Sequence, residues 1–171
     1  MKGLTGILIL AGLALLAPAT ASAAPRACTK SVIEQKILHQ DLLTQGQLDD
    51  AGIDVVICGD LNGDGRAEGL FTVGSGGTAG DTHAGVLKGG PNNGVGAVAV
   101  WTERVHIAVR RRNSTTFEMS FPDYAPDDPQ CCASAYRIWR YVWRTNEFGF
   151  KSWVHTSSRT VSEPPAGFKG G

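Results

Sequence analysis

Four side chains that carry an oxygen donor occur within nine residues, the first three of them on alternate positions, and a glycine follows the third. Ca²⁺ in proteins takes six to eight oxygen ligands at about 2.3–2.6 Å, gathered by a tightly curled loop. A backbone carbonyl between the third and fourth donors supplies a further oxygen. The sequence therefore predicts a calcium site. Its expected ligands are the side chains of Asp60, Asn62, Asp64 and Glu68 and the main-chain oxygen of Arg66.

This acidic loop is not an EF-hand, because the twelfth position of that motif requires a bidentate Glu and here it is Phe71. The segment resembles the calcium loops of FG-GAP repeats in integrin-type β-propellers. A propeller needs several blades and no second copy occurs, so the propeller is excluded. A metal-free turn at 62–65 is the alternative. We favour calcium because clustered carboxylates repel one another without a cation.

All four cysteines lie after residue 23, and an even number in an exported protein indicates disulfides. Two pairings remain open. Either Cys28 bonds Cys58 while Cys131 bonds Cys132, or the adjacent pair bonds back to the other two. We favour the first, although adjacent Cα atoms about 3.8 Å apart lie below the usual disulfide range.

The adjacent cysteines belong to the segment Asp127-Asp128-Pro129-Gln130-Cys131-Cys132-Ala133-Ser134. It resembles an Asp-Asp-Pro-x-Cys-Cys-Pro-Ser motif of exported bacterial proteins that include the LppP/LprE-type lipoproteins of actinobacteria. In this chain Ala133 replaces the usual proline. The resemblance implies an exported protein of the cell envelope and implies no particular activity.

Two further groups of residues are candidates for ligand binding. Asp81 and His83 lie in a glycine-rich run at 74–96, where we favour a flexible loop and a binding loop is the alternative. Trp139, Tyr141 and Trp143 share one face of an expected strand. We expect these three aromatic side chains to lie in the core, with an exposed platform for sugar rings or a partner protein as the alternative.

The elements that must position these residues are one helix followed by strands. The Ser-x-x-Glu pattern at Ser31 predicts a helix over residues 32–45 that ends at Gly46. Alternating apolar residues then predict strands at 53–58, 69–73, 82–87, 95–101, 105–112 and 115–121, the last three as a meander, and a final hairpin at 136–144 and 148–155. The expected fold class is α+β, an N-terminal helix on one antiparallel sheet.

Residues 1–23 have the pattern of a secretory signal peptide, with cleavage expected after Ala23. We expect a single domain at 24–160 and a flexible C-terminal tail at 161–171. After cleavage, the chain has fifteen basic and sixteen acidic side chains, a balance that does not favour nucleic-acid binding. The apolar run of the signal peptide is too short for a membrane span.

No acid, base and nucleophile set can be assembled from the residue order. The sequence therefore favours an exported, non-enzymatic module of the cell envelope, stabilised by calcium and disulfides, whose partner is a protein or a cell-envelope glycan. The alternatives are a small secreted hydrolase, with Asp81, His83 and Asp123 in one pocket, and an inhibitor of a foreign enzyme.

Overall fold

The computed structural model describes residues 24–129 and 131–171, and the expected signal peptide lies outside the described residues. The helical segments are η1 (Arg26–Cys28), α1 (Lys30–His39), α2 (Gln45–Ala51) and η2 (Pro91–Asn93). The strands are β1 (Ile53–Gly59), β2 (Glu68–Gly74), β3 (Asp81–Gly89), β4 (Val95–Glu103), β5 (Ala108–Asn113), β6 (Thr116–Asp123), β7 (Ala135–Thr145), β8 (Lys151–Val161) and β9 (Lys169–Gly170).

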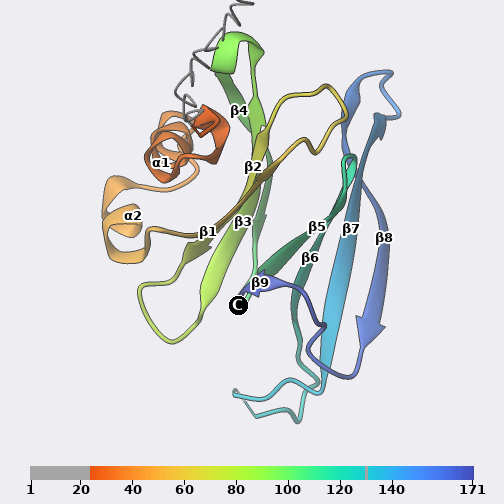
Figure 1. Cartoon of the computed structure of the whole chain (residues 1–171). Helices are drawn as coiled ribbons and strands as arrows, with labels where there is room; N and C mark the ends of the chain where they lie inside the picture. The colour runs from red at the N-terminus through yellow and green to blue at the C-terminus, as the bar shows by residue number, and fades with distance from the viewer. Residues whose placement is uncertain (1–23, 130) are drawn as a thin grey trace, which may run out of the picture.

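The strands form two antiparallel sheets that face one another, and the helices lie on the far side of the first sheet (Figure 1). Sheet A has the order β1-β2-β3-β4, and sheet B has the order β8-β7-β6-β5-β9. The expected antiparallel pairing is confirmed. The molecule is nevertheless largely β, and the expectation of one sheet is wrong.

The division into two sheets occurs between β4 and β5, where the sequence predicts an unbroken meander. β4 pairs only with β3, and β5 starts the second sheet by pairing with β6. His106, in the connection, has a left-handed φ of 50°, which redirects the chain. Val105 is consequently 48% exposed and does not share the buried face of Ile107 and Val109.

The single expected helix is two helices. Asp41, with φ of 52°, interrupts the helical path after α1. The expected capping box at Ser31 is wrong, because α1 begins earlier and its N-cap is Thr29. The capping box that forms is Thr44 with Gln47, which opens α2 and places Gly46 inside a helix that it was expected to end. The bend allows apolar residues of both helices, such as Ile33 of α1 and Leu48 of α2, to pack against sheet A.

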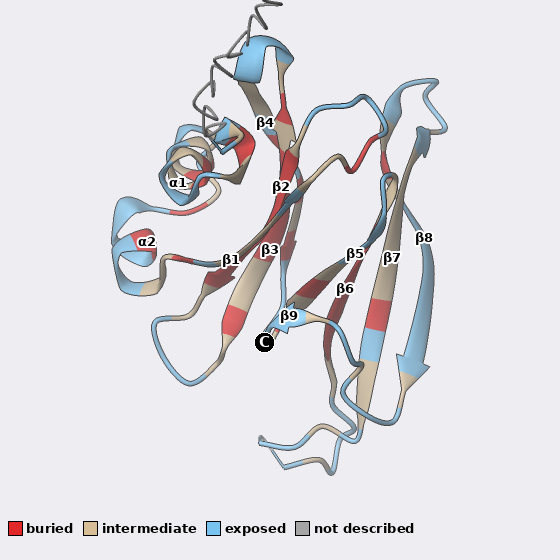
Figure 2. Ribbon diagram, in the orientation of Figure 1, coloured by how far each residue is buried: buried red, intermediate tan, exposed pale blue. Residues whose placement is uncertain are grey.

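Sheet A is covered on both faces, and two hydrophobic cores result (Figure 2). Phe71 of β2 packs with Ile33 and Ile37 of α1 in the first core. Its neighbour Leu70 points to the opposite face and packs with Phe117 of sheet B in the second core. β2 is therefore buried on both faces, and all of its residues from Glu68 to Val73 are buried.

The C-terminal segment, expected to be a flexible tail, contains β9. Lys169 pairs with Val109 and Gly170 with Ala108, so β9 extends sheet B beside β5. The backbone N–H of Gly171 also donates to Asp81 Oδ2 at 3.2 Å. Residues 164–171 thus form one wall of a groove at this end of sheet B.

Candidate ligand-binding groove

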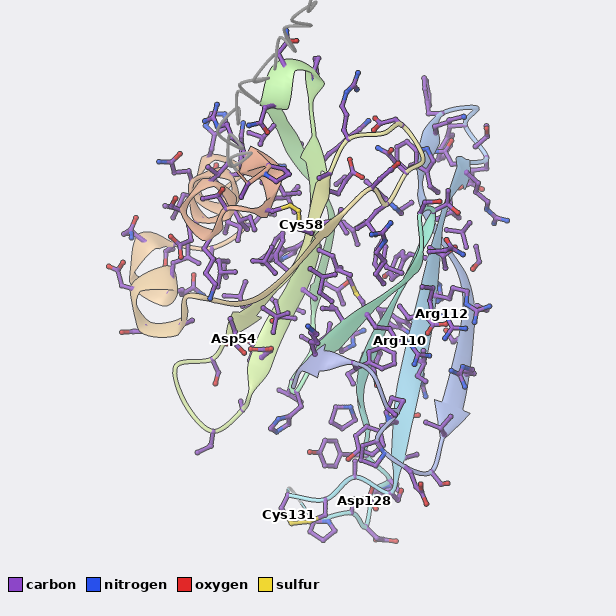
Figure 3. The ribbon with its side chains drawn as sticks, in the orientation of Figure 1. Asp54, Cys58, Arg110, Arg112, Asp128 and Cys131 are labelled. Atoms are coloured by element: carbon purple, nitrogen blue, oxygen red, sulfur yellow. A yellow bond between two sulfur atoms is a disulfide. The ribbon has the colours of Figure 1, made fainter. Side chains whose placement is uncertain are left out.

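Two adjoining cavities of about 370 and 770 Å³ lie at the end of sheet B that carries the adjacent cysteines. Both are lined by His106, Tyr124 and Cys131, so they form one groove. Its floor comes from β5, β6 and β7, and one wall is the 124–134 loop, where Figure 3 labels Asp128 and Cys131. The other wall is the 164–171 segment.

The 124–134 loop is held in shape by Asp128. Its Oδ2 accepts hydrogen bonds from the backbone N–H of Ser134 at 2.7 Å and of Ala125 at 2.8 Å. These two bonds, that of Ser134 first, hold the pKa of Asp128 below its usual value. The carboxylate therefore stays ionised and closes the loop around the disulfide between Cys131 and Cys132. This gives the Asp-Asp-Pro-x-Cys-Cys segment a structural role.

The lining of the groove is mainly aromatic and apolar, with polar groups at its edges. Tyr124, Tyr136 and Phe168 contribute rings from three separate segments. Phe168 is held in place by the guanidinium of Arg110, 4.3 Å from the ring centroid. Ser120, 3% exposed, contributes a hydroxyl to the lining. Tyrosine combines an apolar face with a polar hydroxyl, so this groove suits a small ligand that has both kinds of surface.

The acidic loop is a compact network of hydrogen bonds at the opposite end of the molecule. Asp60 Oδ1 accepts from the backbone N–H of Gly63 at 2.7 Å, and Oδ2 accepts from Gly65 at 3.0 Å. Asn62 Oδ1 accepts a hydrogen bond from the backbone N–H of Asp64, and Asp64 Oδ1 accepts one from the backbone N–H of Arg66. Burial acts to raise the pKa of Asp60, but the backbone donors outweigh it and lower the pKa.

Glu68 closes this loop from inside the fold. It is fully buried, and its oxygens accept from the backbone N–H of Leu61 at 2.8 Å, from Asn62 Nδ2 at 3.2 Å and from the N–H of Gly89 at 3.3 Å. Burial raises the pKa of Glu68 despite these donors. Arg66 turns its guanidinium to Asp64. In the described part of the chain, no three His, Cys, Asp or Glu side chains are grouped to hold a metal.

The disulfide pairing is the first of the two predicted layouts. Cys28 bonds Cys58, with Cα atoms 5.4 Å apart, and joins η1 to β1 (Figure 3). η1 packs so closely on β2 that a Cβ at Gly69 would clash with the carbonyl of Ala27. Glycine is therefore required at this position of β2 for the disulfide-bonded layer to seat.

Asp81 and His83 are not brought together. Asp81 lies on the side of β9, and burial raises its pKa although Thr72 and Gly171 donate to it. His83 lies beside α2 in a separate cavity of about 290 Å³, where burial lowers its pKa. Asp123 is bound to Arg137 at 2.7 Å. These three residues therefore do not form the pocket that the hydrolase alternative needs.

The three aromatic residues of β7 lie on the face of sheet B that is turned toward sheet A. Tyr141 stacks on Phe117 with ring centroids 5.0 Å apart, and Trp139 meets Phe121 edge to face at 4.8 Å. Trp143 contacts Trp153 at 4.5 Å. They are half-buried between the sheets, as expected for core residues, and do not form a flat exposed platform.

Several groove residues were not singled out by the sequence analysis, among them His106, Tyr136 and Phe168. The sequence places them 30 or more residues apart, and their proximity follows from sheet pairing. The one sequence feature that could have pointed to the groove is the Tyr-Ala-Pro run at 124–126, before the two aspartates.

No described helix is long and apolar enough to cross a bilayer. Comparisons with family models, curated proteins and solved structures found no match.

Proposed function

We propose that this protein is an exported, non-enzymatic binding module of the cell envelope that holds a short saccharide in the groove beside the Cys131–Cys132 turn. The observation that carries the proposal is the pair of adjoining cavities that share His106, Tyr124 and Cys131. Their volumes lie in the range of small-ligand sites. The signal-peptide pattern at 1–23 and the resemblance around the adjacent cysteines support the compartment.

The saccharide assignment rests on the chemistry of the lining. Sugars present apolar C–H faces and peripheral hydroxyls, and the groove offers aromatic rings with hydroxyl and backbone groups at their margins. Ser120, His106 and Asp128 line the groove, but no hydrogen bond between them is found in the described residues. Asp128 is instead engaged by the backbone of Ala125 and Ser134, which favours binding over hydrolysis.

The test is a titration of the mature protein with N-acetylglucosamine oligomers, followed by amide chemical shifts. We expect shifts at Tyr136 and Phe168, and at least tenfold weaker binding by a Tyr136→Ala/Phe168→Ala variant. The matched control is Phe148→Ala, which removes a ring that is 74% exposed and lies outside the groove. Shifts confined to residues outside the groove, or equal loss in the control, would contradict the proposal.

We also propose that the acidic loop binds Ca²⁺ and stabilises the fold. Asp60 Oδ2, Asn62 Oδ1 and Asp64 Oδ1 each accept one backbone N–H and keep a second lone pair, and the loop is already curled by such bonds. Loops of this kind in extracellular proteins typically bind with Kd of about 10⁻⁴–10⁻³ M.

Millimolar Ca²⁺ should therefore raise the melting temperature of the mature protein. The same concentration should have no effect on an Asp60→Ala/Asp64→Ala variant. An equal response of the two proteins would reduce the segment to a metal-free turn.

A further inference from the structure

The outer face of sheet B, which is turned away from sheet A, gathers arginines from three strands. Arg110 of β5 and Arg140 of β7 lie on either side of Glu118 of β6 in the strand register, and both bond to it. Side chains alternate along a strand, so residues two or four positions away share this face. Arg112 is at the end of this alternation in β5, where the register shifts between Arg111 and Asn113. The set comprises Arg110, Arg112, Arg140, Arg144 and Arg159, and we name it the arginine face; Figure 3 labels the first two.

Arg159 joins the face through β8, because it lies opposite Ile138, two residues before Arg140. No local sequence pattern indicates this surface, because its five arginines come from three strands, β5, β7 and β8. Within the run at 110–112, successive side chains point to opposite faces of sheet B, so this run by itself does not indicate a basic patch.

The charge of the arginine face is only partly compensated. Its one central acid, Glu118, is fully buried and already bound by two guanidiniums, those of Arg110 and Arg140. Arg112, Arg144 and Arg159 are exposed, and within residues 24–129 and 131–171 none of them makes a side-chain hydrogen bond or ion pair. Three guanidiniums, each with five N–H donors in a planar fork, are therefore available to a ligand.

Guanidinium groups bind phosphate through paired, charge-assisted hydrogen bonds, more specifically than an ammonium does. The three available groups are spread across the face, since adjacent strands are about 4.8 Å apart and residues along a strand advance about 3.3 Å. Arg159 lies opposite Ile138, six residues before Arg144, so these two groups are about 20 Å apart along the strands. A single phosphate ion cannot contact groups so dispersed, whereas a linear polymer with many phosphates can.

We propose that the arginine face binds a linear phosphate polymer. Single-stranded nucleic acid fits it less well, because base recognition needs exposed aromatic rings. Trp139, Tyr141 and Trp143 are turned toward sheet A, and Tyr136 and Phe168 are only partly exposed in the groove. A membrane also fits it less well. The large exposed apolar residues nearest to it, Phe148 and Phe150, are at the hairpin tip, not on the sheet face.

The experiment measures binding of the mature protein to long-chain inorganic polyphosphate at about 50 mM salt, where electrostatic contacts are strong. The test variant is Arg112→Gln/Arg144→Gln/Arg159→Gln, which breaks no described side-chain bond on this face. The control variant is Arg26→Gln/Lys30→Gln/Lys36→Gln, which removes the same charge from the helical layer on the opposite side of the molecule. Circular dichroism and the melting temperature check that both variants fold.

We expect the test variant to bind polyphosphate at least tenfold more weakly and the control to stay within about twofold, with orthophosphate failing to compete at equal phosphate concentration. Equal weakening in both variants, or no binding by the unaltered protein, would overturn the proposal. So would tighter binding to single-stranded DNA or to phosphatidylglycerol vesicles, which would assign the face to nucleic acid or to a membrane. N-acetylglucosamine binding should be unchanged in both variants, which separates this surface from the groove.

Discussion

At the scale of single residues, the best-defined electrostatic arrangement is Glu118 between two arginines. Burial alone would raise the pKa of Glu118, but hydrogen bonds and charges from Arg110 and Arg140 outweigh it and hold the pKa below its ordinary value. A carboxyl whose pKa is depressed in the folded protein stabilises the fold above its unfolded pKa. That stabilisation is lost as the pH falls through the folded pKa.

Replacing Glu118 by Gln should therefore destabilise the protein by about 2–3 kcal/mol at pH 7, because two guanidiniums lose their counter-charge. This expected loss of stability is smaller than for a fully buried triad, because the Arg140 side chain is 42% exposed. Urea unfolding should show the difference shrinking as the pH falls below the ordinary glutamate range. Glu163→Gln, at an exposed site, is the matched control, and a pH-independent difference would contradict this account.

At the scale of elements, the segments that the sequence predicts best are those with local signals. The alternation of apolar residues located β1 and β2 to within one residue and identified the β7–β8 hairpin, although β8 extends to Val161 and not to residue 155. The helical region was misjudged because two capping patterns compete, one at Ser31 and one at Thr44, and only packing against sheet A decides between them. The expected meander is interrupted at residues 104–107, where the left-handed backbone of His106 redirects the chain into the second sheet.

The Cys28–Cys58 disulfide ties the helical layer to sheet A and closes a sequence separation of 30 residues. Replacing both cysteines by serine should lower the free energy of unfolding by about 3–4 kcal/mol, from the entropy that the unfolded chain regains. The matched control is the double serine variant of Cys131 and Cys132. The disulfide between these two closes only two residues, so the variant should lose about 1 kcal/mol. Equal losses in guanidinium unfolding would refute this difference in roles.

At the scale of the whole molecule, sheet A is the common layer of two cores. Leu70 and Phe71 are consecutive on β2 and serve the inter-sheet core and the helix–sheet core respectively. Neither core can be lost without exposing one face of the same sheet. We infer that the three layers unfold together.

Leu70→Ala and Ile33→Ala remove fully buried side chains from different cores, and each should cost about 2–5 kcal/mol. Far-UV circular dichroism and tryptophan fluorescence should give coincident unfolding transitions in both variants. Val105→Ala, at a site 48% exposed, should change stability by less than about 0.5 kcal/mol. A separate early transition in Ile33→Ala would show instead that the helical layer unfolds alone.

The sequence by itself predicted the order of helix and then strands, the curled acidic loop and the burial of the β7 aromatics Trp139, Tyr141 and Trp143, and it left two cysteine pairings open. These features depend on residues close in the chain or on simple alternation. Only the tertiary structure decided that there are two sheets, that Asp81 and His83 lie apart, and which residues line the groove. It also decided that five arginines share one face. Strand pairing brings such residues together across long sequence separations, and no local pattern records that pairing.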